Sequence, residues 1–144
     1  MAEIFSAEWT TAWGRELASS DAYRQAAASW EGSLLLELGA APELGLAEPR
    51  LCYLDLWHGE CREARSGSAG DAETSDYVIA ATPLAWRRIL EGEVAPIAAL
   101  MRGMLELRKG ALSALVPQVA AARELVAAAS RIDTSYPRQW RSTG

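Results

Sequence analysis

The chain has 144 residues, of which 50% are hydrophobic and 23% are charged, and this composition is typical of one globular domain with its own core. The formal net charge of −5 argues against a nucleic-acid surface, because phosphate binding requires clustered lysine and arginine side chains. The acidic N-terminal sequence lacks the apolar stretch of a signal peptide, and we find no stretch that is long and apolar enough to span a bilayer. We therefore expect a cytoplasmic protein with no nucleic-acid partner and no stable membrane anchor.

An aromatic stripe predicts the first helix. Ser6 is a suitable N-cap residue, and apolar residues recur every four positions from there to about residue 18. The residues of this stripe are Phe5, Trp9, Trp13 and Leu17. A shorter helix follows, with Ser20 as its N-cap and Tyr23 facing inward, and it ends before the sequence Trp30-Glu31-Gly32.

Three stretches with the character of strands come next. They cover residues 33–38, 50–58 and 61–66, and the middle stretch, RLCYLDLWH, has the strongest pattern. Gly59-Glu60 separates the last two stretches and suits a two-residue hairpin turn with glycine at its first central position. These features predict an antiparallel hairpin.

The position of this turn predicts which residues face each other across the hairpin. The predicted pairs are His58 with Cys61, Trp57 with Arg62, Leu56 with Glu63, and Leu54 with Arg65. Trp57 and Arg62 would form a cation–π pair on the exposed face of the sheet. Cys52 lies too far along the ladder from Cys61 for a disulfide, so we expect two free thiols.

Helices and strands alternate in the second half of the chain. Residues 76–81 have the pattern of a strand. Thr82-Pro83 predicts the start of a helix, because threonine can cap it and proline fits the first turn, where no N–H is needed. That helix should end at Gly92, and a further helix covers residues 95–103.

Residues 102–110, RGMLELRKG, carry two glycines and three basic residues, which raises the question of a phosphate-binding loop. A loop of the Walker A type requires Gly-Lys-Ser/Thr at a fixed spacing, and here Arg108 and Gly110 occupy two of the required positions. The motif therefore fails. The alternation of apolar and polar residues instead predicts a half-buried strand, with Leu105 and Leu107 on its inner side.

A long helix over residues 111–131, which Pro117 would bend or restart, completes the predicted elements. Their order is α-α-β-β-β-β-α-α-β-α, a block of strands with one strand added after two helices. This order predicts an α+β fold with a single, mostly antiparallel five-stranded sheet and helices packed over one face. We expect one domain over residues 1–132 and a polar C-terminal tail over residues 133–144.

Four stretches of the chain resemble the sterol carrier protein type 2 family of lipid-binding domains. In chain order they are Trp30-Glu31-Gly32 with the apolar strand after it, LCYLDLWHGECREAR at 51–65, DYVIAATPLAWRRILEG at 76–92 followed by Val94-Ala95-Pro96, and RGMLELRKGALSAL at 102–115. The order and spacing of these stretches carry the resemblance, which extends over most of residues 1–131.

The resemblance implies an apolar tunnel between sheet and helices. It also implies non-catalytic binding, or transfer, of a lipid-like or other long apolar ligand, with no cofactor and no metal. The tryptophan-rich first helix and the long, alanine-rich final helix depart from the family pattern, so the resemblance does not extend to the identity of the ligand. The predicted tunnel residues are Leu54, Leu56, Trp86, Met101, Leu105, Leu107, Leu112, Leu115, Val116 and Val119.

Two alternatives to an open tunnel stay open at this stage. The wall of a tunnel and an ordinary hydrophobic core have the same composition, so these leucines could simply pack against each other. The same fold with a collapsed cavity could also serve as an interaction or dimerisation module. Its apolar helix surfaces would make the contact, together with Tyr136 and Trp140 of the tail.

An enzyme is the least favoured interpretation. Asp55 could act as a base if it were buried in an apolar pocket, where its pKa would rise. The predicted pairing of His58 with Cys61 could indicate a nucleophile or half of a zinc site, but too few further ligands share that face. His58 is the only histidine in the sequence, so we expect neither catalysis nor a metal site.

Overall fold

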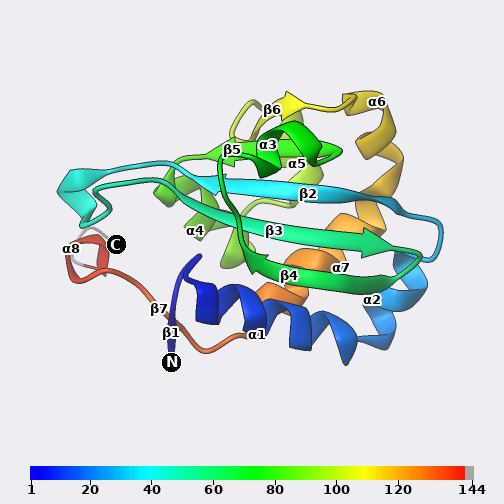
Figure 1. Ribbon diagram of the computed structural model, residues 1–144, viewed down its shortest axis with the longest axis horizontal. Coiled ribbons are helices and arrows are strands. Elements are labelled where there is room, and N and C mark those ends of the chain that lie inside the picture. The colour runs from blue at the N-terminus through cyan, green and yellow to red at the C-terminus, as the bar shows by residue number, and fades with distance from the viewer. Residues whose placement is uncertain (142–144) are drawn as a thin grey trace.

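The computed structural model of the chain describes residues 1–141 and shows one sheet with helices layered against it (Figure 1). The main sheet has five strands in the order β4-β3-β2-β5-β6. They are β2 (Glu31–Leu38), β3 (Arg50–Trp57), β4 (Glu60–Ser66), β5 (Tyr77–Ala81) and β6 (Glu106–Lys109). Within this sheet β2 and β5 pair in parallel, and the other three pairings are antiparallel. The predicted fold class, α+β with a mostly antiparallel five-stranded sheet, is confirmed.

Most of the helical layer covers one face of this sheet (Figure 1). Its main helices are α1 (Ala7–Ala18), α2 (Asp21–Ala26), α4 (Pro83–Leu90), α5 (Pro96–Met101) and α7 (Val119–Ser130). The connection from β4 to β5 crosses the opposite face and carries the short helix α3 (Asp71–Thr74). A 3-10 turn, η1 (Pro42–Leu44), lies between β2 and β3. We call the face under the main helices the inner face and the other one the outer face.

Helices α1, α2 and α4 begin at the N-cap residues that the sequence predicts. The side chains of Ser6, Ser20 and Thr82 accept hydrogen bonds from backbone N–H groups in the first turns of α1, α2 and α4. These bonds satisfy donors that have no partner inside the helix, which is why serine and threonine are favoured there. The predicted stripe on α1 is buried, and each of its four residues is at most 2% exposed.

The register of the β3–β4 hairpin differs from the prediction. The turn is formed by His58 and Gly59, both with positive φ values of 50° and 83°, rather than by Gly59-Glu60. The observed pairs are Trp57 with Glu60, Leu56 with Cys61, Asp55 with Glu63, Leu54 with Ala64, and Tyr53 with Arg65. A bulge between Asp55 and Leu56 shifts the register once more. The predicted pairing of His58 with Cys61, and the pairs that followed from it, are therefore wrong.

The contact of this turn with α2 accounts for its position. A Cβ atom on Gly59 would lie 2.5 Å from the backbone oxygen of Arg24, so only glycine fits there. Two predictions survive the change of register. The Arg62 guanidinium lies 4.9 Å from the centroid of the Trp57 ring, and both Cys52 and Cys61 are free thiols.

The final helix is interrupted rather than continuous. It consists of α6 (Leu112–Leu115), a 3-10 turn η2 (Val116–Gln118) and α7. Pro117 stands inside the turn, where it removes a backbone donor and its ring crowds the preceding helical turn. The proline therefore separates a short, mostly exposed helix from the longer one that packs on the body of the protein.

Helix α1 lies close to the edge of the sheet because one of its residues is glycine. A Cβ atom on Gly14 would stand 2.8 Å from the Cβ atom of Ala64 on β4. A larger residue at either position would push the helix outward. This close approach brings the aromatic stripe of α1 onto the inner face of the sheet.

Residues 134–141 lie against the body of the chain. A two-residue strand, β7 (Thr134–Ser135), pairs in parallel with β1 (Ala2–Glu3), and the last turn of helix is α8 (Arg138–Arg141). Trp140 is 0% exposed, and its ring centroid lies 4.9 Å from that of Tyr136. The division of the chain at residues 132 and 133 stays a prediction, but Trp140 is here buried by its own chain.

We expect Trp140→Ala to lower the free energy of unfolding by about 3–5 kcal/mol, because it removes a fully buried aromatic ring and leaves a cavity. Urea denaturation monitored by circular dichroism would measure this loss. Trp57→Ala is the matched control, since Trp57 is 40% exposed, and it should cost about 1 kcal/mol or less. Equal stabilities of Trp140→Ala and the wild type would contradict the docked position of the C-terminal residues.

Candidate functional site

A cavity of about 90 Å³ lies between the inner face of the sheet and the helices. The strands contribute Leu34, Leu36, Leu56 and Ile79, and the other lining residues are Trp13, Tyr23, Trp30, Trp86, Pro96, Ile97, Leu100, Leu105, Leu115, Gln118, Ala121, Ala122, Leu125 and Val126. For comparison, an engineered apolar cavity of about 150 Å³ binds benzene. The interior is therefore neither completely filled nor an open tube, and in this conformation it admits only a small apolar group.

Four of the ten predicted tunnel residues line this cavity. They are Leu56, Trp86, Leu105 and Leu115. Leu54 is 0% exposed but packs in the solid part of the core, and Leu107 is half-buried on β6 opposite Ile79. The remaining four side chains are exposed and lie outside the cavity: Met101, Leu112, Val116 and Val119.

The sequence interpretation missed most of the aromatic wall and the contribution of α7. The sequence predicts Trp13 on the apolar stripe of the first helix and Tyr23 facing inward. Both side chains are buried, and both also border the cavity. The three consecutive leucines Leu34–Leu36 in β2, a strand buried on both faces along most of its length, were a signal that this strand is central. The apolar period predicted for the final helix passes through Ala122 and Val126, which line the cavity, but not through Ala121.

The cavity presents almost no polar group. The indole N–H groups of Trp13, Trp30 and Trp86 donate to the backbone oxygens of Leu125, Gly32 and Glu37 at 3.0, 3.1 and 2.8 Å. Because these donors are satisfied, the rings offer only apolar surface to the interior.

Two polar side chains remain among the lining residues, Tyr23 and Gln118. Burial raises the pKa of Tyr23 well above its usual value, so its hydroxyl stays neutral. Gln118 is only half-buried.

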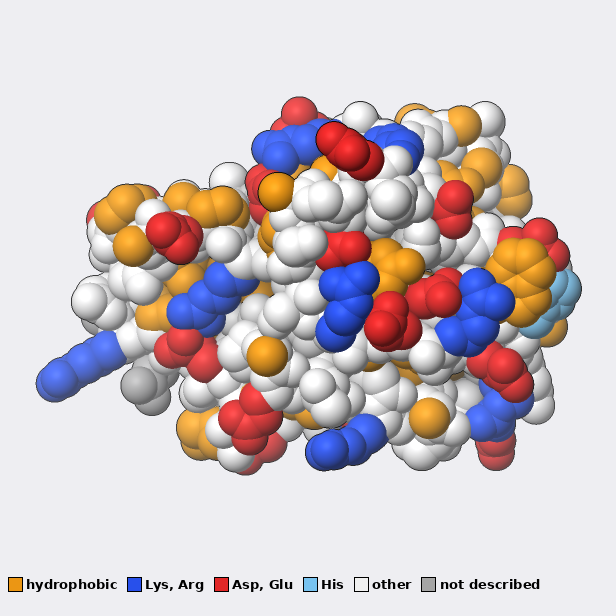
Figure 2. Space-filling view, in the orientation of Figure 1, with side chains coloured by type: hydrophobic (Ala, Val, Ile, Leu, Met, Phe, Trp, Pro, Cys, Tyr) orange, Lys and Arg blue, Asp and Glu red, His pale blue; other side chains and the backbone are white. Residues whose placement is uncertain are grey.

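The side of the cavity formed by α5 and α7 is the less protected one. Leu100, Ala122 and Leu125 are half-buried there, whereas the lining residues of the strands are buried. Just outside, Leu112, Val116 and Val119 are 38%, 39% and 39% exposed. Figure 2 shows hydrophobic side chains gathered over α6, and no charged residue occurs from position 110 to position 122. We call this surface the α6–α7 apolar face.

The segment that carries this surface corrects one expectation from the sequence. Leu112–Ser130 is 19 residues long with a mean hydropathy of 1.3, so by length and composition alone it could cross a membrane. Only 22% of it is buried inside the protein. A single segment of this kind is weak evidence of insertion into a membrane. The prediction that no stretch is long and apolar enough to span a bilayer is nevertheless wrong.

Asp55 does not lie in an apolar pocket. It projects from the outer face of β3, between the inward-facing Leu54 and Leu56, and so lies across the sheet from the cavity. Its two carboxylate oxygens accept hydrogen bonds from Arg62 at 3.2 and 3.0 Å. This ion pair with Arg62 gives the Asp55 carboxylate a structural role on the outer face. Asp55 therefore does not have the apolar surroundings that a catalytic base of the kind considered from the sequence would need.

His58 and Cys61 also point to different partners. The Nε2 atom of His58 lies 2.6 Å from a carboxylate oxygen of Glu31, and the Sγ atom of Cys61 lies 3.4 Å from the backbone oxygen of Glu63. Burial raises the pKa of Cys61 to about 11 and that of Cys52 to about 12, which keeps both thiols protonated near neutral pH. Within residues 1–141, no three His, Cys, Asp or Glu side chains are grouped closely enough to hold a metal ion.

Of three comparisons with known proteins, the one with solved structures gives matches, whereas no protein-family model and no curated protein matches the chain. The chain is similar to the protein in a crystal structure of sterol carrier protein 2. The two sequences are 45% identical, the match covers 90% of this chain and 99% of that chain, and the TM-score is 0.82. The solution structure of a conserved hypothetical protein from Thermus thermophilus, named as a candidate sterol carrier protein, is 43% identical, with 94% and 93% covered and a TM-score of 0.83. Apo sterol carrier protein 2 from Yarrowia lipolytica, at 12% identity, 89% and 98% coverage and a TM-score of 0.54, shares the fold alone.

The burial of the two thiols predicts slow reaction with Ellman's reagent. At pH 8, a thiol with a pKa near 11 is a thiolate in only about one molecule in a thousand, and the thiolate is the reactive form. We expect slow modification of Cys61 in the native protein, no modification of the fully buried Cys52, and immediate reaction of both thiols in guanidinium chloride. Cys61→Ser should abolish the slow phase and Cys52→Ser should leave it. Rapid labelling of Cys61 in the native protein at neutral pH would contradict this expectation and support a role for Cys61 as a nucleophile.

Proposed function

Because the chain belongs to the sterol carrier protein 2 family, we propose that it binds a lipid-like, apolar ligand in the cavity between sheet and helices, without catalysing a reaction on it. The observation that carries the proposal is the cavity itself, an apolar space at the centre of the molecule bordered by sixteen residues without polar side-chain atoms other than satisfied indole N–H groups, and by Tyr23 and Gln118. The two free thiols are compatible with the reducing cytoplasm, where we propose that the protein acts.

The affinity would come from removing apolar surface from water. Each buried methylene group contributes about 0.8 kcal/mol. A ligand that uses this source of affinity needs few polar contacts, and the cavity offers only the Tyr23 hydroxyl and the Gln118 amide. We therefore expect strong dependence on the apolar part of the ligand and weak dependence on its head group.

A long ligand has to extend beyond the present cavity. The half-buried side between α5 and α7 provides the direction, and the exposed leucine and valine side chains of the α6–α7 apolar face continue the apolar surface outward. The interruption at Pro117 leaves α6 a single short turn of helix, joined to α7 through a 3-10 turn. Displacing α6 would consequently disturb few contacts of the core.

The lining residues argue for binding without chemistry. They include no carboxylate, histidine, cysteine or lysine, and the raised pKa of Tyr23 makes it a poor proton donor or acceptor near neutral pH. The side chains that suggested an enzyme lie elsewhere, on the outer face or at the hairpin turn. This supports the proposal that the protein carries its ligand unchanged.

A pair of neighbouring alanines on α7 allows a sharp test. Ala121 is 7% exposed and lines the cavity, whereas Ala120 faces solvent. Ala121→Phe should fill the space and weaken binding of a fluorescent fatty-acyl probe by about tenfold or more, the equivalent of two buried methylene groups. Ala120→Phe adds the same ring outside the cavity and should bind the probe as the wild type does.

Two measurements complete this test. Urea denaturation should show that Ala121→Phe is folded, with a change of at most about 1–3 kcal/mol from overpacking. Native mass spectrometry of the purified protein should show a co-purified apolar ligand that is reduced in Ala121→Phe and present in Ala120→Phe. Equal probe affinity of the two variants would place the ligand outside this cavity, and no binding of any acyl probe by the wild type would refute the proposal.

The α6–α7 apolar face supports a second candidate function, in which two copies of the chain associate through it. Its exposed side chains, and not the buried Trp140, are the surface that such a contact would use. Light scattering would then report a dimer at high concentration, and Val119→Glu would return it to a monomer because a charge cannot be buried there without a partner. A monomer at all concentrations would remove this candidate.

A further inference from the structure

The cavity ends abruptly along the central strand. Leu34 and Leu36 of β2 line it, but Leu38, two residues further along the same inner face, does not and is 0% exposed. The space between sheet and helices continues past Leu36, but it is occupied by packed side chains. The first of these is the indole ring of Trp86, which itself borders the cavity.

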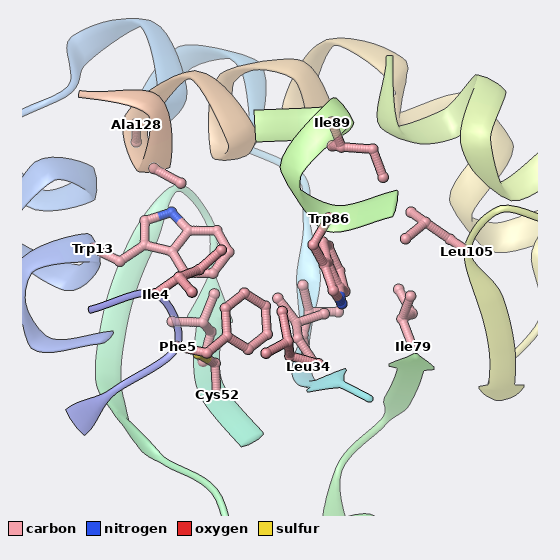
Figure 3. Close-up of a cluster of buried hydrophobic side chains, with 14 of the residues drawn as sticks. Ile4, Phe5, Trp13, Leu34, Cys52, Ile79, Trp86, Ile89, Leu105 and Ala128 are labelled. Atoms are coloured by element: carbon pink, nitrogen blue, oxygen red, sulfur yellow. The ribbon is translucent and has the colours of Figure 1, made fainter. Parts of the chain in front are cut away.

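Trp86 is held in place from both sides. Its indole N–H donates to the backbone oxygen of Glu37 at 2.8 Å, which ties α4 to the central strand at the point where the cavity stops. The Phe5 ring lies behind it, with 5.2 Å between the two ring centroids. Figure 3 shows the Trp86 ring between Phe5 on one side and Ile79 and Leu105 on the other. The ring therefore cannot turn aside without losing its hydrogen bond or displacing Phe5.

Phe5 occupies this position in an unfavourable backbone conformation. Its φ angle is 56°, in the left-handed region that residues other than glycine rarely adopt. Two hydrogen bonds of the preceding residue, Ile4, hold the segment there. Its backbone oxygen accepts from Arg50 at 2.9 Å, and its backbone N–H donates to the backbone oxygen of Ser135 at 2.9 Å. Phe5 also stacks on Trp9 at 5.2 Å. A strained residue kept in place by several contacts is a candidate for a specific role.

We propose that Trp86, backed by Phe5, is an end stop that sets how much of a ligand the cavity can bury. The inference rests on the proposed function and names the ligand class: a flexible, unbranched acyl chain that enters end-first and stops against the indole ring. A rigid fused-ring ligand such as a sterol cannot bend to use the remaining space. At about 90 Å³, the cavity beside Trp86 is smaller than one that holds a benzene ring.

A homologous series of saturated fatty acids tests the end stop. Their dissociation constants would be measured by displacement of a fluorescent fatty-acyl probe. Each added carbon should tighten binding by about fourfold while it is buried, as expected from the transfer of a methylene group out of water. Beyond the length at which the chain reaches Trp86, further carbons stay near the mouth and the affinity should level off. Cholesterol should bind more weakly than the best fatty acid.

Three variants show whether Trp86 and Phe5 cause this limit. In Trp86→Leu the affinity should level off at a longer chain length. Phe5→Leu keeps the Trp86 hydrogen bond and removes the ring behind Trp86, so it should shift the limiting chain length in the same direction. This second variant provides the test if Trp86→Leu does not fold. Trp140→Leu is the control for lost stability, because Trp140 is also a buried tryptophan but does not line the cavity.

The outcomes separate the end stop from the proposed function. Failure of every fatty acid to bind the wild type would overturn the proposed function itself. Binding without a limiting length, or a limit that stays the same in Phe5→Leu and in any folded Trp86→Leu, would overturn the end stop alone. A shift of the limit in these variants and not in Trp140→Leu is the expected result.

Discussion

The structure depends on giving partners to the indole N–H groups that lie between the helices and the sheet. An unsatisfied buried donor costs about 1–3 kcal/mol, so each of these rings has to lie beside an acceptor. Trp9 donates to the Thr134 hydroxyl, Trp13 to the backbone oxygen of Leu125, and Trp86 to that of Glu37. These bonds join α1 to the C-terminal segment, α1 to α7, and α4 to β2. The helical layer is thereby fixed over the sheet at points distant in the sequence.

Local patterns were sufficient to predict the elements and the fold class. Capping by Ser6, Ser20 and Thr82 and the aromatic stripe of α1 involve residues within one or two turns of each other, so the sequence shows them directly. The hairpin register could not be read in the same way. It depends on the bulge at Asp55 and on the close contact of Gly59 with Arg24 in α2, which is a tertiary contact. The error mattered because it had paired His58 with Cys61.

The candidate site was predictable on the strands and much less so on the final helix. On β3 the two-residue period places Leu56 on the inner face. For the final helix, the prediction assumes that the three-to-four-residue period of apolar residues continues through Pro117, but the structure has a 3-10 turn there. Leu115 reaches the cavity before this turn, and after it the inward positions become Ala121, Ala122, Leu125 and Val126. A sequence pattern cannot show such a change of phase, because it depends on how the proline is accommodated.

The distribution of large and small side chains explains why a cavity exists at one end of the interior and not at the other. Near the N-terminal segment, the Phe5 ring packs between Trp9 and Trp86 and fills the interior. On α7, the side chains that face the cavity include Ala121 and Ala122, which are too small to reach the strands, so the interior remains partly empty. The same alanines bury little apolar area and hold α7 less firmly than leucines would. The packed aromatic side chains thus stabilise the fold, while the alanines of α7 leave the space in which we propose that an apolar ligand binds.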